Sequence, residues 1–169
     1  MPRMTKSAAL MMALGIGAAV AAGGAFAADE DPMPKNASPA TKTAYARHAH
    51  FEELGKNFKA MNDELKKDNP DKALLASSAK TVNTLATGLP SWFPKGTGVE
   101  ARPKSLAKPD IWTDAAGFSA AAANLQVQAS KLNQAAMSGD VGAVKAQFRP
   151  TGGACKNCHD KFRKEEKKS

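Results

Sequence analysis

The sequence lacks the patterns of several large classes of protein. No segment alternates apolar and polar residues as a strand does, so we expect no sheet. No internal repeat and no second domain can be recognised. The chain also has no Ser/His/Asp set, no paired carboxylates on one helical face and no phosphate-binding loop. We therefore expect an all-α protein that is not an enzyme.

The first 27 residues lack acidic groups and have the pattern of a secretory signal peptide. Arg3 and Lys6 form a basic start, residues 7–24 are uncharged, and residues 25–27 (AFA) place small residues before a cleavage point. An uncleaved membrane anchor is the alternative, but Ala and Gly make this segment only weakly apolar for a span. We expect cleavage at that point, export to a bacterial periplasm and no stable membrane insertion.

The remaining chain suits one domain. Residues 28–38 are polar and proline-rich, which predicts a flexible N-terminal arm, and residues 39–169 would form the domain. The formal net charge of the whole sequence is +8, and most of this positive charge remains after the leader is removed. Nucleic-acid binding is not expected, because an exported chain without an aromatic or motif signature gives no support for it.

Proline, glycine and capping residues divide the domain into four expected helices. Ser38 and Asn69 each precede a proline, which is a common N-cap and first-turn pair, and Asp140 would cap the last helix. The expected helices span about residues 39–67, 70–88, 109–138 and 141 to the basic tail, with a loop over 89–108. Pro150 interrupts the last pattern and should kink or restart that helix.

Both cysteines lie in residues 155–159 (CKNCH), close to the C-terminus. A Cys-x-x-Cys-His pattern is typical of covalent attachment of a c-type haem. Residues i and i+3 share one helical face. Cys155 and Cys158 can therefore both reach the vinyl groups on one porphyrin edge, and His159 can ligate the iron.

Three other interpretations of the cysteine pair are weaker. A thioredoxin-like redox pair normally follows a strand, and no strand is expected here. A local disulfide is another possibility. A zinc site needs about four ligands. Only His48, His50 and His159 could join the thiols, at a spacing that fits no zinc finger.

Each expected helix carries apolar residues at three- and four-residue spacing, with Arg47 inside the seam of the first. Four such seams predict an antiparallel four-helix bundle. Cys155, Cys158 and Phe162 fall on the seam of the last helix. The haem is therefore expected inside the bundle.

Four segments resemble the class II c-type cytochromes, the cytochrome c′ family. They are residues 155–163 (CKNCHDKFR), 92–98 (WFPKGTG), 108–112 (KPDIW) and 47–55 (RHAHFEELG). The resemblance covers essentially the whole mature chain. It implies a four-helix bundle with one haem c near the C-terminus, and a periplasmic protein that transfers single electrons.

The resemblance also implies roles for two arginines. Arg163 would lie beside the proximal imidazole and the haem edge, where a fixed cation could raise the reduction potential; a solvated place in the basic tail is the alternative. Arg47 interrupts an apolar seam, where an unpaired charge is costly. A haem propionate would be its partner, unless the side chain extends outward to solvent.

The distal face decides which kind of cytochrome is present. Low-spin relatives carry a methionine ligand four residues after the arginine, and here that position is Phe51, which has no donor atom. The iron would then lack a protein sixth ligand. His48 and His50 are rotated away from Phe51 by about 100° or more on a helix. A histidine sixth ligand stays an alternative.

The expected partners follow from this arrangement. A vacant site opposite His159 would allow nitric oxide or carbon monoxide to bind. The basic residues after Lys156 could attract an acidic redox protein, although they also suit the end of a helix. The family resemblance adds a homodimer formed through the first two helices.

Overall fold

The structure of the protein is a computed structural model that describes residues 31–165. The expected signal peptide and the first residues of the expected arm lie outside this part of the chain. Within residues 31–165 no helix is long and apolar enough to cross a membrane.

Helices dominate the described residues, and no strand occurs among them. The long helices are α1 (Pro39–Glu64), α2 (Lys72–Gly88), α4 (Ala115–Met137) and α5 (Val141–Phe162). The connection between α2 and α4 contains two short elements, the 3₁₀ helix η1 (Leu89–Trp92) and the helix α3 (Asp110–Thr113). The all-α prediction is confirmed.

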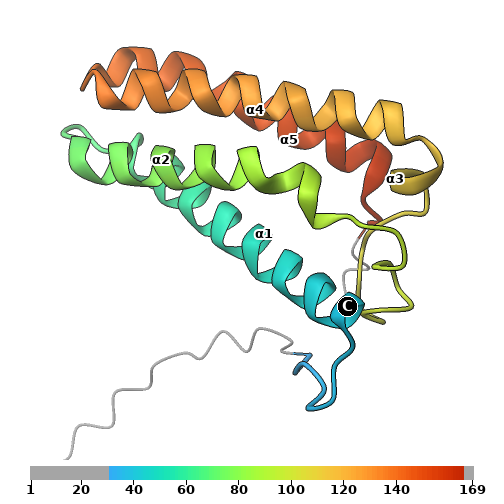
Figure 1. The fold of residues 1–169 in the computed structure, drawn as a ribbon. Coiled ribbons are helices and arrows are strands. Elements are labelled where there is room, and N and C mark those ends of the chain that lie inside the picture. The colour runs from blue at the N-terminus through green and yellow to red at the C-terminus, as the bar shows by residue number, and fades with distance from the viewer. Residues whose placement is uncertain (1–30, 166–169) are drawn as a thin grey trace, which may run out of the picture. The chain divides into compact units, whose positions relative to one another are not determined.

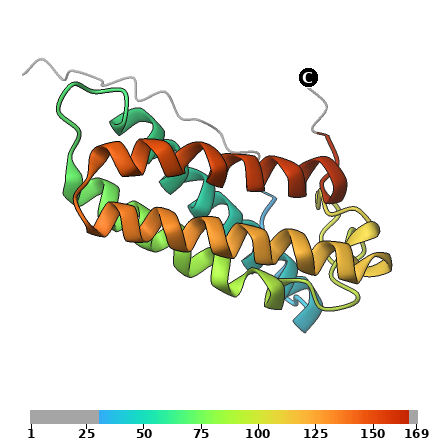
Figure 2. The ribbon, with the colours of Figure 1, turned by 90° about the horizontal axis from the view of Figure 1, so that it is seen from above.

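The four long helices form an antiparallel bundle. Helix α5 packs along α4, α4 along α2, and α2 along α1, with successive long helices running in opposite directions (Figure 1). Seen from above, α2, α4 and α5 lie side by side while α1 crosses at an angle (Figure 2). This arrangement confirms the predicted bundle.

Helix α1 and helix α5 begin where the sequence indicates. The Ser38 hydroxyl accepts a hydrogen bond from the backbone N–H of Thr41, with Pro39 in the first turn. The Asp140 carboxylate accepts one from the N–H of Ala143. These contacts satisfy N–H groups that a helix start leaves without partners.

Helix α2 begins two residues later than predicted. Asp71, not Asn69, is its N-cap, and its carboxylate accepts hydrogen bonds from the N–H groups of Ala73 and Leu74. One carboxylate here satisfies two N–H groups, and its negative charge is favoured at the positive end of a helix. The prediction of an Asn69–Pro70 start was wrong for this reason.

The expected third helix is two helices. Asp114 breaks it with φ −113° and ψ 60°, and its carboxylate caps α4 by accepting from the N–H of Gly117. Aspartate competes for backbone hydrogen bonds in this way inside helical sequences. Asp114 also pairs with Lys161 at the end of α5, so the break is tied to the tertiary structure.

Helix α5 continues through Pro150 and does not restart there. The next residue, Thr151, is fully buried, and its hydroxyl lies within hydrogen-bonding distance of the carbonyl oxygens of Gln147 and Gln128. Gln128 belongs to α4. Packing against α4 therefore holds the helix together where proline alone would weaken it.

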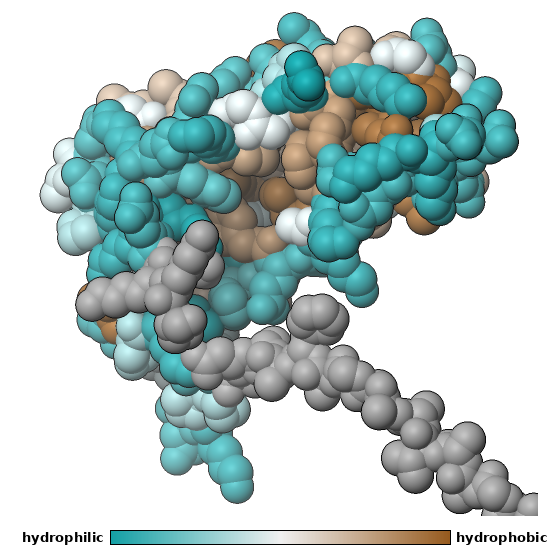
Figure 3. Space-filling view, turned by 180° about the vertical axis from the view of Figure 1, so that it is seen from behind, coloured by the Kyte–Doolittle hydropathy of each residue, from teal (hydrophilic) through white to brown (hydrophobic). Residues whose placement is uncertain are grey.

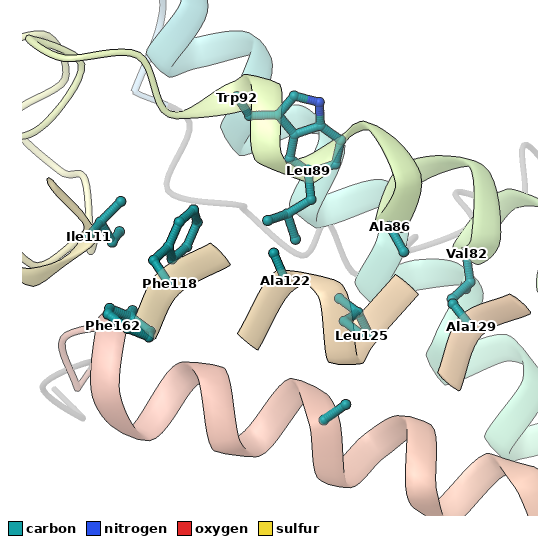
Figure 4. Close-up of a cluster of buried hydrophobic side chains, with 11 residues drawn as sticks. Val82, Ala86, Leu89, Trp92, Ile111, Phe118, Ala122, Leu125, Ala129 and Phe162 are labelled. Carbon is teal, nitrogen blue, oxygen red and sulfur yellow. The ribbon is translucent and has the colours of Figure 1, made fainter. Parts of the chain in front are cut away.

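The core consists of two clusters of buried apolar side chains. The larger cluster joins α2, η1, α3, α4 and α5 (Figure 4). Its buried members are Val82, Ala86, Leu89, Trp92, Ile111, Phe118, Ala122, Leu125, Ala129, Ala154 and Phe162. The smaller cluster lies toward the other end of the long helices and includes Met61, Leu75 and Leu132. Phe51, Cys155 and Cys158 pack on the larger cluster without being fully buried.

Candidate functional site

The two cysteines lie on α5, separated by one helical turn, and both are free thiols. Burial raises the pKa of Cys155 to about 11, with a smaller contribution from the neighbouring Cys158. Burial also raises the pKa of Cys158. Both groups are therefore protonated at neutral pH, unlike the low-pKa thiolates of redox-active pairs.

A cavity of about 400 Å³ opens between α1 and α5 beside this motif. Its lining residues are Leu54, Gly55, Phe58, Lys59, Asn62, Phe148, Cys155 and His159. Figure 3 shows this side of the molecule. Apolar side chains form the bottom of a recess, and hydrophilic side chains surround it. The thiol of Cys155 and the imidazole of His159 thus face the same space.

Two aromatic rings connect α1 to α5 at this cavity. Phe58 of α1 stacks on Phe148 of α5, with ring centroids 4.1 Å apart and planes nearly parallel. Gly152 lies beside the Phe58 ring, which a Cβ at that position would contact at 3.5 Å. The pair is a direct side-chain contact between the two helices beside the cavity.

Phe51 lies one turn before Leu54 on α1, at the edge of an aromatic group. Its ring meets Trp92 edge-on at 5.4 Å and lies 6.1 Å from Phe93. Phe51 does not itself line the cavity; Leu54 and Gly55 do. The role of Trp92 and Phe93 was missed from the sequence, although both belong to the WFPKGTG segment that carries the family resemblance.

The two histidines of α1 have partners away from the cavity. His50 stacks on Trp92 with ring centroids 4.7 Å apart. Nε2 of His48 lies 3.2 Å from a carboxylate oxygen of Glu52 on the exposed side of the helix. Neither histidine lines the cavity.

Arg47 is buried, and its side chain turns inward to the loop that follows η1. Its guanidinium donates hydrogen bonds to the carbonyl oxygen of Trp92, to the hydroxyl and carbonyl oxygens of Thr97, and to the hydroxyl of Ser105. It also lies over the Phe93 ring at 4.5 Å. Burial lowers its pKa to about 10, a value at which it still carries its charge at neutral pH.

All hydrogen-bond acceptors given above for Arg47 are neutral. Within residues 31–165, no carboxylate forms an ion pair with it. Glu100 acts on it only through its charge, and a buried guanidinium without a direct ion pair is energetically costly. The site therefore suits an additional anionic group, such as a haem propionate.

Arg163 follows α5 directly and is connected to His159. Its backbone N–H donates to the His159 carbonyl at 3.0 Å, and its backbone pairs with Ala107 of the preceding loop. Burial lowers the pKa of His159, and the positive charge of Arg163 lowers it further. The imidazole is therefore held neutral, which is the form that ligates a metal.

These residues fit a c-type haem. Two thiols one turn apart and an adjacent neutral imidazole are the groups that such a cofactor requires. The apolar cavity and the buried cation without a direct ion pair suit its ring and its propionates. Within the described part of the chain, no group of three or more His, Cys, Asp or Glu side chains could hold a metal ion. The zinc alternative has no ligand set there.

Comparison with known proteins leads to the same family. The sequence model described as "Cytochrome C'" matches residues 42–163. A cytochrome c′ of Rubrivivax gelatinosus is 41% identical over 97 residues, which cover 55% of this chain and 70% of the relative.

Solved structures of cytochromes c′ have the same fold. One is a nitric oxide complex of a variant from Alcaligenes xylosoxidans, with 29% identity and a TM-score of 0.67 over 75% of this chain and 97% of that one. Another, described by its ligand-controlled dimer dissociation, has 25% identity and a TM-score of 0.70 over 76% of this chain and 98% of that one. The chain therefore belongs to the cytochrome c′ family, and its cofactor is haem c.

Proposed function

We propose that this protein is a periplasmic monohaem cytochrome that transfers single electrons. Cys155 and Cys158 would bind the haem covalently, and His159 would be its proximal ligand. When bound, the haem supplies an iron that accepts and releases one electron. The observation that carries the proposal is the apolar cavity between α1 and α5, which Cys155 and His159 share. We assign the protein no enzymatic reaction.

The side chains around the cavity would set the environment of the cofactor. Leu54, Phe58 and Phe148 line the cavity with apolar groups, which would strengthen electrostatic effects around a bound haem. Arg47 would neutralise a propionate from its buried position. Arg163, whose charge already acts on His159, would favour the reduced state over the more positive oxidised one.

We further propose that the position opposite His159 has no protein ligand. Phe51 has no donor atom, and its contacts with Trp92 and Phe93 hold an aromatic group on the α1 side of the bundle. The alternative, a histidine sixth ligand, is disfavoured because His50 stacks on Trp92 and His48 is near Glu52.

Binding of a diatomic gas is a second candidate function. The nitric oxide complex of the related Alcaligenes protein supports it. Phe51 is only partly buried, so its ring has room to move aside for a small ligand.

The dimer named in the description of another relative supports a homodimer here. Acidic redox proteins are the proposed electron-transfer partners of this basic chain.

Optical and EPR spectra of the purified ferric and ferrous protein, with and without carbon monoxide, test this assignment. The expected result is a high-spin protein whose ferrous spectrum changes when carbon monoxide is added. The variant Phe51→Met should become low-spin and lose the response, because a thioether can occupy the open position. Val127→Met, at an exposed position of α4 that does not line the cavity, is the control and should stay high-spin. A low-spin wild-type spectrum that ignores carbon monoxide would contradict the open sixth position.

A further inference from the structure

A second cavity, of about 330 Å³, lies beside the loop that joins η1 to α3. It shares no lining residue with the cavity at the cysteine motif. Its lining residues are Lys95, Gly96, Gly98, Val99, Glu100, Ala107, Pro109, Trp112, Thr113 and Lys164. The proposed haem site therefore leaves this second space unassigned.

Two lysines from distant parts of the sequence meet at this cavity. Lys95 comes from the loop after η1, and Lys164 follows the end of α5. Among residues 31–165 neither of them forms an ion pair. By contrast, Lys59, Lys156 and Lys161 each pair with an aspartate. The cavity thus combines two lysines whose ammonium groups form no ion pair with the described residues.

The carboxylate of Glu100 also lines the cavity, but it is already engaged. One of its oxygens accepts a hydrogen bond from the backbone N–H of Gly98 at 3.0 Å. Its pKa is lowered by its own backbone N–H first, by that of Gly98 and then by the charge of Arg47. Glu100 is therefore anionic at neutral pH, and its charge is directed into the loop.

Apolar side chains form the rest of the lining. Val99 is 44% exposed although it is a large hydrophobic residue, and Ala107 and Pro109 lie near it. The Trp112 indole is fixed in place, because its N–H donates to the carbonyl oxygens of Phe93 and Pro94. A rigid indole beside an exposed valine offers an apolar surface that does not have to reorganise when a ligand binds.

We propose that this cavity binds a small organic carboxylate with an apolar body, such as an aromatic carboxylic acid. Lys95 and Lys164 would bind the carboxylate, and Trp112 and Val99 would contact the apolar part. The volume is at the lower end of the range of about 300–1,000 Å³ typical of ligand sites, which favours a small molecule. Because the lysines are exposed, the affinity should be modest and should weaken as salt is added.

Benzoate titration of the haem-loaded protein tests the site. The indole ¹⁵N–¹H resonance of Trp112, assigned through Trp112→Phe, should shift with saturation. The resonance of Trp92, which does not line the cavity, should stay unchanged. Benzamide, which has the same ring without the charge, should bind several-fold more weakly. Shifts of both indoles, equal binding of benzamide, or no saturable shift at all would overturn the proposal.

Charge variants give a second, independent test. Lys95→Ala and Lys164→Ala should each weaken benzoate binding by about threefold, the scale of a partly exposed ion pair. Glu100→Gln should strengthen it, because a nearby negative charge is removed. Lys145→Ala, an exposed lysine outside the cavity, is the control and should have no effect. If Lys95→Ala and Lys164→Ala behaved like this control, the two lysines would not form the site.

Discussion

The two sides of the bundle are packed in different ways. Between α2 and α4 the buried positions include Ala79, Ala86, Ala122 and Ala129, whose small side chains allow the two helices to approach closely. Between α1 and α5 the contact is made by the partly buried ring pair of Phe58 and Phe148, and a cavity remains beside it. The α2–α4 side is complete as protein. The α1–α5 side leaves a space that the proposed haem would fill.

Removal of the haem attachment should have the largest effect, and it should act on the α1–α5 side. Cys155→Ala combined with Cys158→Ala should abolish covalent haem and lower the free energy of unfolding by about 4 kcal/mol or more, the scale of a ligand at a thousand times its dissociation constant. Haem staining after denaturing electrophoresis and thermal unfolding measure the two effects. A double variant with wild-type stability and no haem would contradict the contrast between the two sides.

A cavity in the smaller buried cluster, to which all four long helices contribute, should cost less and should leave the haem unaffected. Leu132 is fully buried in the smaller cluster with Met61 and Leu75. Leu132→Ala should lower the free energy of unfolding by about 3 kcal/mol, measured by denaturant titration, with an unchanged absorption spectrum. Val127→Ala, on the same helix at 51% exposure, is the control and should change stability by less than about 0.5 kcal/mol. A spectral change in Leu132→Ala would show that this cluster is coupled to the haem site.

The ring pair on the α1–α5 side should show a smaller, specific coupling. A double-mutant cycle of Phe58→Leu and Phe148→Leu should give a coupling free energy of about 1 kcal/mol, because stacked rings contribute about this much beyond buried area. Denaturant unfolding of the haem-loaded variants provides the measurement. Additive effects of the two substitutions would mean that the stack does not hold α1 to α5.

The smallest effect concerns the turn between α1 and α2. Glu64 is buried, and its carboxylate accepts a hydrogen bond from the backbone N–H of Asp71 and pairs with Lys67. The Asp71 N–H and then Lys67 lower the pKa of Glu64. Because the folded pKa is lowered, its contribution to stability is present at neutral pH and is lost as the pH falls below 4.5.

Comparison of the wild type with Glu64→Gln tests whether stability is lost as the pH falls. Glutamine keeps one acceptor for the Asp71 N–H, so the loss at neutral pH should be slight. The difference in melting temperature between the two proteins should shrink as the pH is lowered through the acidic range. A difference that is constant with pH would show that the charge of Glu64 does not matter.

The sequence predicted the bundle and the haem c cofactor well, because both depend on local patterns. Helical periodicity and the caps at Ser38 and Asp140 placed most helix ends correctly. The breaks were predicted less well. The start of α2 at Asp71, the interruption at Asp114 and the unbroken helix at Pro150 depend on hydrogen bonds whose relative strength the sequence does not reveal.

The position of the apolar seams was also only partly predictable. Phe51 and Phe58 have the spacing of core residues but are only partly buried. Periodicity cannot distinguish a side chain that faces protein from one that faces a cofactor. On α5 the buried positions are Val144, Thr151, Ala154 and Phe162. Phe162 agrees with the predicted seam, whereas Ala154 is buried in place of the predicted Cys155. Threonine and alanine give a weak hydrophobic signal, so this small rotation could not be seen in the sequence.

The way in which α5 ends has a consequence for the proposed electron transfer. A chain terminus normally frays. Here the backbone N–H of Lys108 donates to the Phe162 carbonyl, and that of Lys164 donates to the Leu106 carbonyl. The last turn of the helix, which carries His159, is thus held by a neighbouring loop as well as by its own hydrogen bonds. Such a fixed ligand can keep its position in both oxidation states, so that little structural rearrangement has to accompany the arrival or departure of an electron.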